Sequence, residues 1–118
     1  MRVLFINPQR NYLVKNTEFI ALPVGLVSLA TFIQSAGHIV KVIDAPAEDF
    51  QNRELQPNGV YKCGLSDYGI YRQIEDFKPD AVGIACIFTG RFSNVVSISK
   101  LVKKYKDIPV IVGGMHAT

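Results

Sequence analysis

An apolar run close to the end of the chain, residues 108–112, constrains the fold more than any other feature of the sequence. It contains Pro109 and leads directly into Gly113 and Gly114. An apolar run with such boundaries is typical of a strand buried on both faces, and these strands belong to parallel sheets covered by helices. The sequence stops soon after it, which leaves a sheet edge bare, and natural folds cover or continue apolar edges. We therefore expect the chain to be the front part of a larger fold.

Strands and helices alternate along the rest of the chain. Short runs of β-branched and aromatic residues predict strands at residues 3–6, 39–43 and 81–85. Apolar residues at helical spacing predict helices at residues 23–36 and 67–77. A third helix is expected from one more apolar stripe, made of Val95, Ile98, Leu101, Val102 and Tyr105. This alternation indicates an α/β protein.

The alternation predicts a doubly wound parallel sheet with right-handed crossovers. If the strand at residues 3–6 is central, the strand order is 2-1-3-4, which is flavodoxin-like (Rossmann-like) and truncated before the fifth strand. Residues 1–118 then form one domain that is incomplete at its C-terminus. The first helix would lack a neighbour on its face of the sheet.

Local signals define the helix ends and one long connection. Gly37 is expected to end the first helix in a left-handed conformation, and Ser66 is expected to cap the second helix. Residues 46–65 show no periodicity, so we expect a long irregular connection there, with a lid as one interpretation. A single buried stripe is expected on the first helix, made of Leu26, Leu29, Ala30 and Ile33.

Composition narrows the class of protein. Hydrophobic residues make up 48% and charged residues 19% of the chain, which is typical of a globular domain. No apolar run approaches the roughly 18 to 20 residues that a membrane span needs, and the first residues lead into a strand rather than a signal peptide. We therefore expect a cytoplasmic protein with no membrane partner.

The net charge of +3 raises the question of a nucleic-acid partner. The densest basic cluster consists of Lys100, Lys103, Lys104 and Lys106. A nucleic-acid surface can use such a cluster, but no aromatic residues interleave with it. The favoured interpretation is a solvated helix face whose lysines complement the helix dipole, so no nucleic-acid partner is expected.

The two cysteines give no disulfide or metal pattern, because Cys63 is expected in a polar loop and Cys86 at the end of a buried strand. Together they are too few to hold an iron–sulfur cluster. Cys86 lies beside the expected start of the third helix, where the helix N-terminus can favour a thiolate. Structural burial is the favoured role for Cys86.

Ligands of such sheets bind beyond the carboxyl ends of the strands, where the strand order reverses. Residues 7–10, 86–90 and 113–116 should meet at that edge, and each segment carries small or polar residues that let the backbone approach a ligand. The alternative interpretation is purely local: Asn7-Pro8 ends a strand, Thr89 caps a helix, and the two glycines form a turn.

Three polar residues near the strand ends have ordinary explanations. Asp44 ends the second strand, where dinucleotide-binding folds place an acidic residue on a ribose, but no glycine-rich phosphate loop follows the first strand. We interpret Asp44 as a polar strand end and His38 as a turn residue. His116 lies at the ligand edge without an identified carboxylate or nucleophile partner, so no catalytic residue is assigned.

Five sequence motifs together resemble one family. They are Val3-Leu4-Phe5-Ile6-Asn7-Pro8, Leu22-Pro23-Val24-Gly25-Leu26, Ala36-Gly37-His38 followed by Val42-Ile43-Asp44-Ala45, Lys78-Pro79-Asp80-Ala81-Val82-Gly83-Ile84, and Val112-Gly113-Gly114-Met115-His116-Ala117-Thr118. Over essentially its whole length the chain resembles the cobalamin-binding (B12-binding) domain at the N-terminus of radical S-adenosylmethionine enzymes.

This resemblance implies a pocket for the nucleotide tail of cobalamin. In the family, a segment at a middle strand end and a Gly-Gly segment line it, and they match residues 85–89 and Gly113-Gly114 here. With the sheet-edge argument, the candidate cofactor-binding residues are Asn7, Pro8, Gln9, Ala85, Cys86, Phe88, Thr89, Gly113, Gly114 and His116.

The chain departs from the family at the metal ligand. Related methyltransferase and mutase domains carry D-x-H-x-x-G, whose histidine lies beneath cobalt. Counting back from Gly25, the matching positions are Ile20 and Leu22, which cannot ligate a metal, and the family's pocket serine falls on Ala85. The resemblance therefore implies cobalamin bound base-off, without a protein histidine ligand, and tuned for methyl or electron transfer.

The family's catalytic domain follows downstream and carries C-x-x-x-C-x-x-C, which this chain lacks. The resemblance implies a longer radical S-adenosylmethionine enzyme, methyltransferase or cyclase-like, that holds a 4Fe–4S cluster and S-adenosylmethionine in that domain as its partner in cis. Two alternatives stay open. One is a degenerate docking or dimerisation domain without cofactor, forming a homo-oligomer through the uncovered sheet edge. The other is a free-standing flavodoxin-like enzyme that uses Cys86 or His116.

Overall fold

The computed structural model describes residues 1–12, 24–49, 52–56, 59, 61–85 and 92–113. Its main sheet is parallel and four-stranded, in the spatial order β3-β1-β6-β7. The strands are β1 (Arg2–Asn7), β3 (Ile39–Asp44), β6 (Ala81–Ala85) and β7 (Val110–Gly113). Numbered along the sheet's own strands, this is the predicted 2-1-3-4 order, so the predicted flavodoxin-like α/β architecture is confirmed.

The central strand is β1, which is hydrogen-bonded on both sides. It pairs with β3 from Arg2 opposite Ile39 to Asn7 opposite Asp44, and with β6 as far as Ile6 opposite Ile84. The strand order reverses at β1, because the chain first adds a strand on one side of it and then on the other. A crevice beyond the carboxyl ends of β1 and β6 is therefore the place where a sheet of this kind receives a ligand.

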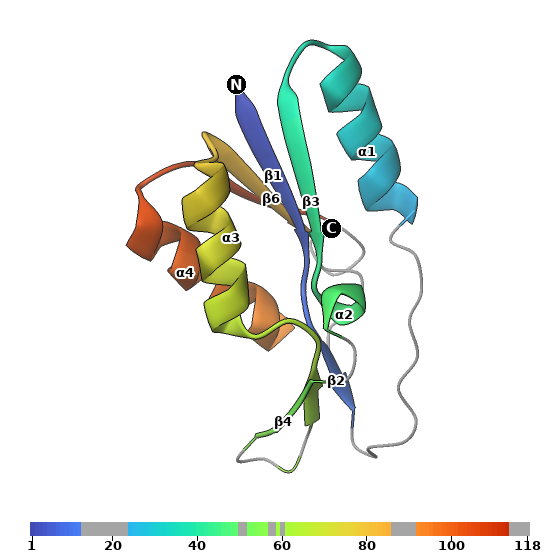
Figure 1. The fold of residues 1–118 in the computed structure, drawn as a ribbon, viewed down its shortest axis with the longest axis vertical. Coiled ribbons are helices and arrows are strands. Elements are labelled where there is room, and N and C mark those ends of the chain that lie inside the picture. Colours follow the sequence, from blue (N-terminus) through green and yellow to red (C-terminus); the bar gives the residue numbers. More distant parts are fainter. Residues whose placement is uncertain (13–23, 50–51, 57–58, 60, 86–91, 114–118) are drawn as a thin grey trace.

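Helices lie on both faces of the sheet (Figure 1): α1 (Val24–Ser35) on one face, and α3 (Asp67–Phe77) and α4 (Phe92–Tyr105) on the other. The predicted caps are present. Ser66 Oγ accepts a hydrogen bond from the Gly69 N–H at 3.1 Å, and Gly37 has a φ of 98°. Ser66 therefore marks the beginning of α3, and Gly37 follows the end of α1, both where the sequence predicts. Caps of this kind satisfy backbone groups that a helix leaves unpaired at its ends.

The hydrophobic core lies between the sheet and the pair α3 and α4. The inward positions of β1 and β6 alternate with outward ones, and the apolar stripes of both helices fill the space above them. The predicted stripes are confirmed. The buried core residues are Leu4, Ile6, Ile43, Ala45, Ile70, Ile74, Phe77, Val82, Ile84, Val95, Ile98, Val102 and Ile108.

The predicted stripe of α1 is wrong at one position. Ala30 is buried and Leu26 and Ile33 are half-buried, but Leu29 is 48% exposed. The reason is geometric, because α1 rests mainly on β3 and to a lesser extent on β1, so its buried face is narrow. The other two long helices of the described residues, α3 and α4, lie on the opposite face (Figure 1).

The expectation of an irregular connection at residues 46–65 is also wrong. A short helix, α2 (Ala45–Glu48), follows β3, and a small antiparallel sheet of order β2-β5-β4 lies near the end of the molecule to which β1 runs (Figure 1). Its strands are β2 (Arg10–Tyr12), β4 (Arg53–Leu55) and β5 (Tyr61–Cys63). Cys63 is therefore a buried strand residue and not part of a polar loop.

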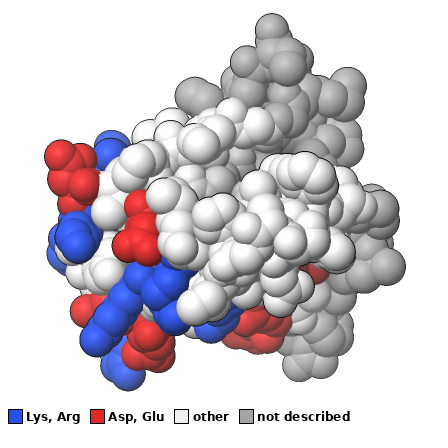
Figure 2. Space-filling view, turned by 90° about the horizontal axis from the view of Figure 1, so that it is seen from above, with Lys and Arg blue, Asp and Glu red and all other residues white. Residues whose placement is uncertain are grey.

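Charge is unevenly distributed over the surface. Figure 2 shows Lys, Arg, Asp and Glu gathered on one side of the molecule in this view, beside a broad surface that carries none of them. The composition of the helices fits this division, because α1 has no charged residue whereas α3 and α4 carry several. No described helix is long and apolar enough to cross a membrane.

Candidate functional site

Three of the predicted site residues meet at the carboxyl edge of the main sheet. Asn7, Ala85 and Gly113 are the last residues of the adjacent strands β1, β6 and β7. Ala85 pairs directly with Gly113, and the β1–β6 pairing reaches Ile6 opposite Ile84, one residue before Asn7 and Ala85. Residues more than 100 positions apart in the chain thus form one short row of small, uncharged groups.

The two small residues of this row leave room above the sheet. Ala85 is half-buried and Gly113 is exposed, and a Cβ atom built on Gly113 would have no described atom within 4 Å. A strand end that lacks side-chain bulk lets a ligand approach the backbone closely. This edge can therefore accept a flat or bulky group lying against the ends of β6 and β7.

Asn7 is held in place by the neighbouring strand end. Its Nδ2 donates a hydrogen bond to Asp44 Oδ1 at 2.9 Å, and the side chain is buried. The Asp44 N–H donates in turn to Glu48 Oε2 at 3.0 Å. Asp44 is therefore a polar strand end that orients Asn7 and α2, which agrees with the interpretation from sequence.

Gln9 connects three separate segments beneath the same edge. Its Nε2 donates to the Leu65 carbonyl oxygen at 2.8 Å and to Asp67 Oδ1 at 2.9 Å. Its own backbone carbonyl accepts from Asn94 Nδ2 at 2.9 Å. Gln9 thus ties the end of β1 to the beginnings of both α3 and α4, and neighbouring Pro8 is buried as well.

The other end of the Gln9 amide has no partner among the described residues. The two acceptors around Nε2 fix which way the amide points, so Oε1 is the buried atom for which the described part of the chain provides no hydrogen-bond donor. A buried acceptor left unpaired costs about 1 to 3 kcal/mol. Such an atom close to the carboxyl edge suits a ligand or a water that brings an N–H or O–H donor.

An ion pair joins the small antiparallel sheet to the beginning of α3, beside Gln9. Lys62 Nζ lies 2.8 Å from Asp67 Oδ1, the same oxygen that accepts from Gln9. The Lys62 side chain is 10% exposed and the Asp67 side chain 39% exposed, so this pair is partly shielded from water. It fixes β5 against the beginning of α3.

Sequence reasoning did not identify Lys62, Asp67 or Asn94 as part of the site. Asn94 carried a weak signal, because it is a polar residue that directly precedes the apolar stripe of α4. Asp67 is an acidic residue in the first turn of α3, which has an ordinary explanation in the helix dipole.

Several predicted positions lie outside the described residues. They are Cys86, Phe88, Thr89, Gly114 and His116, together with the D-x-H-x-x-G positions Ile20 and Leu22. Their roles remain predictions. In the part of the chain that the structure describes, no group of three or more His, Cys, Asp or Glu side chains could hold a metal ion.

The lysine cluster has local partners. Lys103 pairs with Asp107 at 3.1 Å and also donates to the Ile108 carbonyl oxygen at 2.7 Å. Lys104 Nζ lies 5.5 Å from the centroid of the Tyr71 ring. These contacts support the interpretation of a solvated helix face.

A parallel doubly wound sheet with small residues at the carboxyl ends of β6 and β7, next to the point where the strand order reverses, is typical of a ligand-binding α/β domain. Comparison with known families makes this specific: the chain matches the family described as "B12 binding domain" over residues 10–118. The chain therefore belongs to the B12-binding domain family, and the resemblance to a cobalamin-binding domain is confirmed.

The chain is also similar to cytidylyl-2-hydroxyethylphosphonate methyltransferase of Streptomyces wedmorensis, with 32% identity over 121 aligned residues. The alignment covers 98% of this chain but 22% of the relative, so the chain spans less than a quarter of the relative's length. No solved structure matches the chain.

Proposed function

We propose that the chain is the cobalamin-binding module of a radical S-adenosylmethionine iron–sulfur enzyme, of the methyltransferase or cyclase-like kind. The observation that carries the proposal is the row formed by Asn7, Ala85 and Gly113 at the ligand edge of a B12-binding domain. The methyltransferase relative supports the reaction class. The 4Fe–4S cluster and S-adenosylmethionine would be held by a downstream domain in cis.

The described residues fit the cofactor. Cobalamin carries primary amides around its corrin ring, and an amide N–H is the kind of donor that the buried Gln9 Oε1 lacks among the described residues. Ala85 and Gly113 would let the cofactor lie against the strand ends, and Asn7 would be presented in a fixed orientation. When bound, cobalamin supplies a cobalt centre that carries a methyl group or electrons. Pro8, Cys86, Phe88, Thr89, Gly114 and His116 complete the proposed contacts.

We further propose base-off binding without a protein histidine on cobalt. Ile20 and Leu22 occupy the positions of the family's ligand motif. His38 precedes β3 and so lies at the amino edge of the sheet, away from Asn7, Ala85 and Gly113. Among the described residues, then, no histidine stands at the carboxyl edge.

The first experiment mixes the purified chain with hydroxocobalamin, removes free cofactor by gel filtration, and records the absorbance spectrum of the protein peak. Co-elution with a base-off spectrum is expected. A base-on spectrum, or one with histidine beneath cobalt, would refute the binding mode. A colourless peak from a chain that is folded by circular dichroism would refute cobalamin binding by this chain.

A glycine variant locates the site. Gly113→Leu should abolish co-elution, because its side chain would fill the space above the end of β7, while the open surroundings leave the fold intact. The matched control is Gly25→Ala on α1, where a Cβ also meets nothing within 4 Å. Equal retention of cobalamin by both variants would place the cofactor elsewhere.

The second candidate is a docking or dimerisation domain that binds no cofactor. The observation in its favour is the exposure of Val27, Leu29 and Phe32 on α1, together with Ile111 on β7. Large exposed apolar groups on one side of a protein mark interaction surfaces. Light scattering tests this candidate: a dimer that Phe32→Ser converts to a monomer would support it, and a monomeric parent chain would count against dimerisation.

A further inference from the structure

The side-chain oxygen of Gln9 is an acceptor whose direction is fixed by its neighbours. Gln9 Nε2 lies between two oxygen atoms, the Leu65 carbonyl oxygen at 2.8 Å and Asp67 Oδ1 at 2.9 Å. Turning the amide over would place Oε1 against both of these acceptors with no proton between them. Oε1 therefore cannot exchange places with the Nε2 donor, and the group that Gln9 offers to a ligand is an acceptor only.

Lys62 and Asn94 hold Gln9 from two other sides. Lys62 Nζ lies 2.8 Å from the same Asp67 oxygen, and charge-assisted hydrogen bonds of this kind are stronger than neutral ones. The ammonium group thus keeps Asp67 Oδ1 at the place where Gln9 Nε2 donates. Asn94 Nδ2 donates to the Gln9 backbone carbonyl oxygen at 2.9 Å, so the backbone and the side chain of Gln9 are both held.

A fixed acceptor discriminates between neutral and anionic groups of a ligand. An N–H or O–H group can donate to Gln9 Oε1, whereas a carboxylate would bring a further oxygen against it. Gln9 is buried, and no donor for Oε1 is present in the described part of the chain. Burial increases the discrimination, because water is not there to compensate for a missing donor.

The groups at the periphery of the corrin ring match this requirement. They are primary amides at the ends of short flexible arms, so one N–H group can reach an oxygen that the ring itself cannot reach. The side chains that cover Oε1 must move aside to admit such an arm. The hydrogen bond gained by an unpaired buried acceptor favours that movement.

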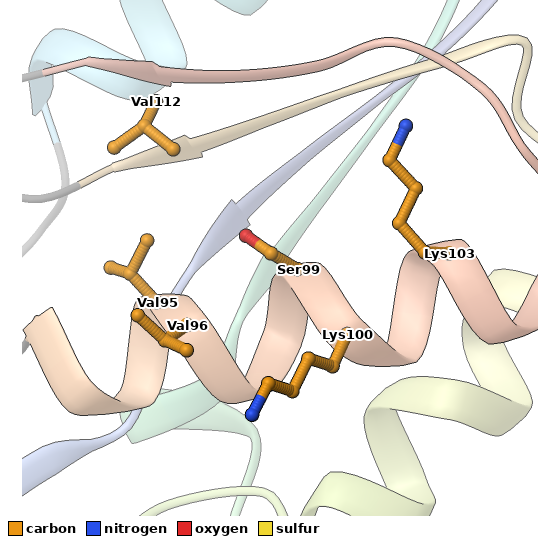
Figure 3. Close-up of a pocket in the computed structure, with 6 residues that line it drawn as sticks. All are labelled: Val95, Val96, Ser99, Lys100, Lys103 and Val112. Carbon is orange, nitrogen blue, oxygen red and sulfur yellow. The ribbon is translucent and has the colours of Figure 1, made fainter.

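A hollow elsewhere in the described chain has the opposite preference. It lies between α4 and β7, measures about 390 Å³, and is lined by valines together with Ser99, Lys100 and Lys103. In Figure 3 both lysines extend from α4, and Val112 of β7 points toward Val95. Ammonium groups are donors only, so a carboxylate suits this hollow better than an amide does. The preference for amide or acid therefore distinguishes the two places.

We propose that Gln9 is a specificity-determining residue that selects a primary amide of the corrin ring over the corresponding carboxylate. Asp67 and Lys62 are positioning residues that hold the Gln9 amide in the orientation this selection requires. The inference rests on the proposed function, because it takes cobalamin as the ligand. It adds the chemical form of the corrin ring that the site accepts.

The test measures dissociation constants by equilibrium dialysis for hydroxocobalamin and for the three monocarboxylic acids made by hydrolysing one of its propionamide groups. The parent chain should bind at least one acid about 10- to 100-fold more weakly than hydroxocobalamin. Gln9→Met keeps the length of the side chain without a comparable acceptor, so the ratio for that acid should fall below about threefold. Equal affinity for all four ligands, or an unchanged ratio in Gln9→Met, would overturn the proposal.

A second pair of variants tests the positioning role. Asp67→Asn offers Gln9 a donor as well as an acceptor, so the amide can turn over and the ratio should fall by at least half. Asp76→Asn makes the same change at an exposed position of the same helix and should leave the ratio unchanged. A purely structural role of Asp67 would lower stability and leave the ratio as it is. Equal ratios in the two variants would therefore overturn the positioning role.

Cobinamide, which has the ring amides but no nucleotide tail, identifies the donor. Gln9→Met should weaken the binding of cobinamide and of hydroxocobalamin by the same factor, whereas an effect on hydroxocobalamin alone would assign the donor to the tail and overturn the proposal. Tighter binding of an acid than of hydroxocobalamin would place the ring in the hollow of Figure 3 and overturn it as well. Binding without discrimination defeats this inference alone, whereas a folded chain that binds no corrinoid defeats the proposed function too.

Discussion

The two faces of the main sheet are covered by helices to different degrees. On the face of α3 and α4, inward side chains such as Leu4, Ile74 and Ile98 are fully buried in one continuous core. On the opposite face α1 lies over β1 and β3, and beyond it Ile111 of β7 is 67% exposed. The same sheet thus has one side that is closed over most of its width and one side that is half open.

The two kinds of helix explain the difference. α3 places its apolar residues on one face and its charged residues on the other, as expected of a helix at the protein surface. α1 has no charged residue, and Phe32 on its outer side is 69% exposed. α1 therefore presents an uncharged outer surface, whereas α3 presents a charged one.

The largest effect should come from the closed face. Ile74→Ala removes a fully buried side chain from the core and is expected to lower the free energy of unfolding by about 2 to 5 kcal/mol. The paired variant on the open face, Leu29→Ala, should cost well under about 1 kcal/mol, because that side chain is half exposed already. Urea unfolding followed by circular dichroism measures both. Similar losses in the two variants would break the comparison.

Next in size is a test of the close contact between Gly83 and Phe5. A Cβ atom at Gly83 would lie 2.9 Å from the Phe5 ring, so Gly83→Ala should lower the free energy of unfolding by about 1 to 3 kcal/mol. Phe5→Leu in the same chain should recover part of that loss. Gly25→Ala has open space around it and should be neutral or stabilising. If Gly83→Ala were as harmless as Gly25→Ala, Phe5 would not be packed on β6 as described.

A third test compares one serine on a helix of each face. Ser66→Ala removes the N-cap of α3 and should lower the free energy of unfolding by about 1 kcal/mol. Ser35→Ala on α1 removes only an exposed hydrogen bond to the Phe32 carbonyl oxygen and should change stability by less than about 0.5 kcal/mol. Thermal unfolding at fixed protein concentration distinguishes them, and a larger loss at Ser35 would contradict the assignment of the cap.

The smallest effect on stability is expected at Phe32. Phe32→Gln should change the free energy of unfolding by less than about 0.5 kcal/mol, because the ring is mostly exposed. The same substitution should lower the fluorescence of the dye anilinonaphthalene sulfonate, which binds exposed apolar surface. Unchanged dye binding together with a large loss of stability would mean that Phe32 is buried in solution.

The four parallel strands and the three long helices were predictable from sequence because each has a local signal. The stripe from Val95 to Tyr105 and the cap at Ser66 need no knowledge of the rest of the chain. The small sheet has no such signal, because each of its strands is three residues long and β2 pairs with β5 about 50 positions away. Strands that short show no measurable alternation.

The same distinction applies to the site. Parallel topology alone brings the ends of β1, β6 and β7 together, so the meeting of Asn7, Ala85 and Gly113 could be predicted. The burial of Gln9 could not, because its partners Leu65 and Asp67 come from segments more than 50 positions away. The exposure of Leu29 depends on what lies beside α1, which the periodicity of α1 alone does not reveal.

The central place of β1 also determines when this domain can fold during its synthesis. β1 is synthesised before both of its hydrogen-bonded neighbours, and the later one, β6, begins only at Ala81. At translation rates of about 5 to 20 residues per second, β1 waits about 4 to 15 s for that partner. During this interval Leu4, Phe5 and Ile6 form an apolar segment of the nascent chain that still lacks one of its two neighbouring strands.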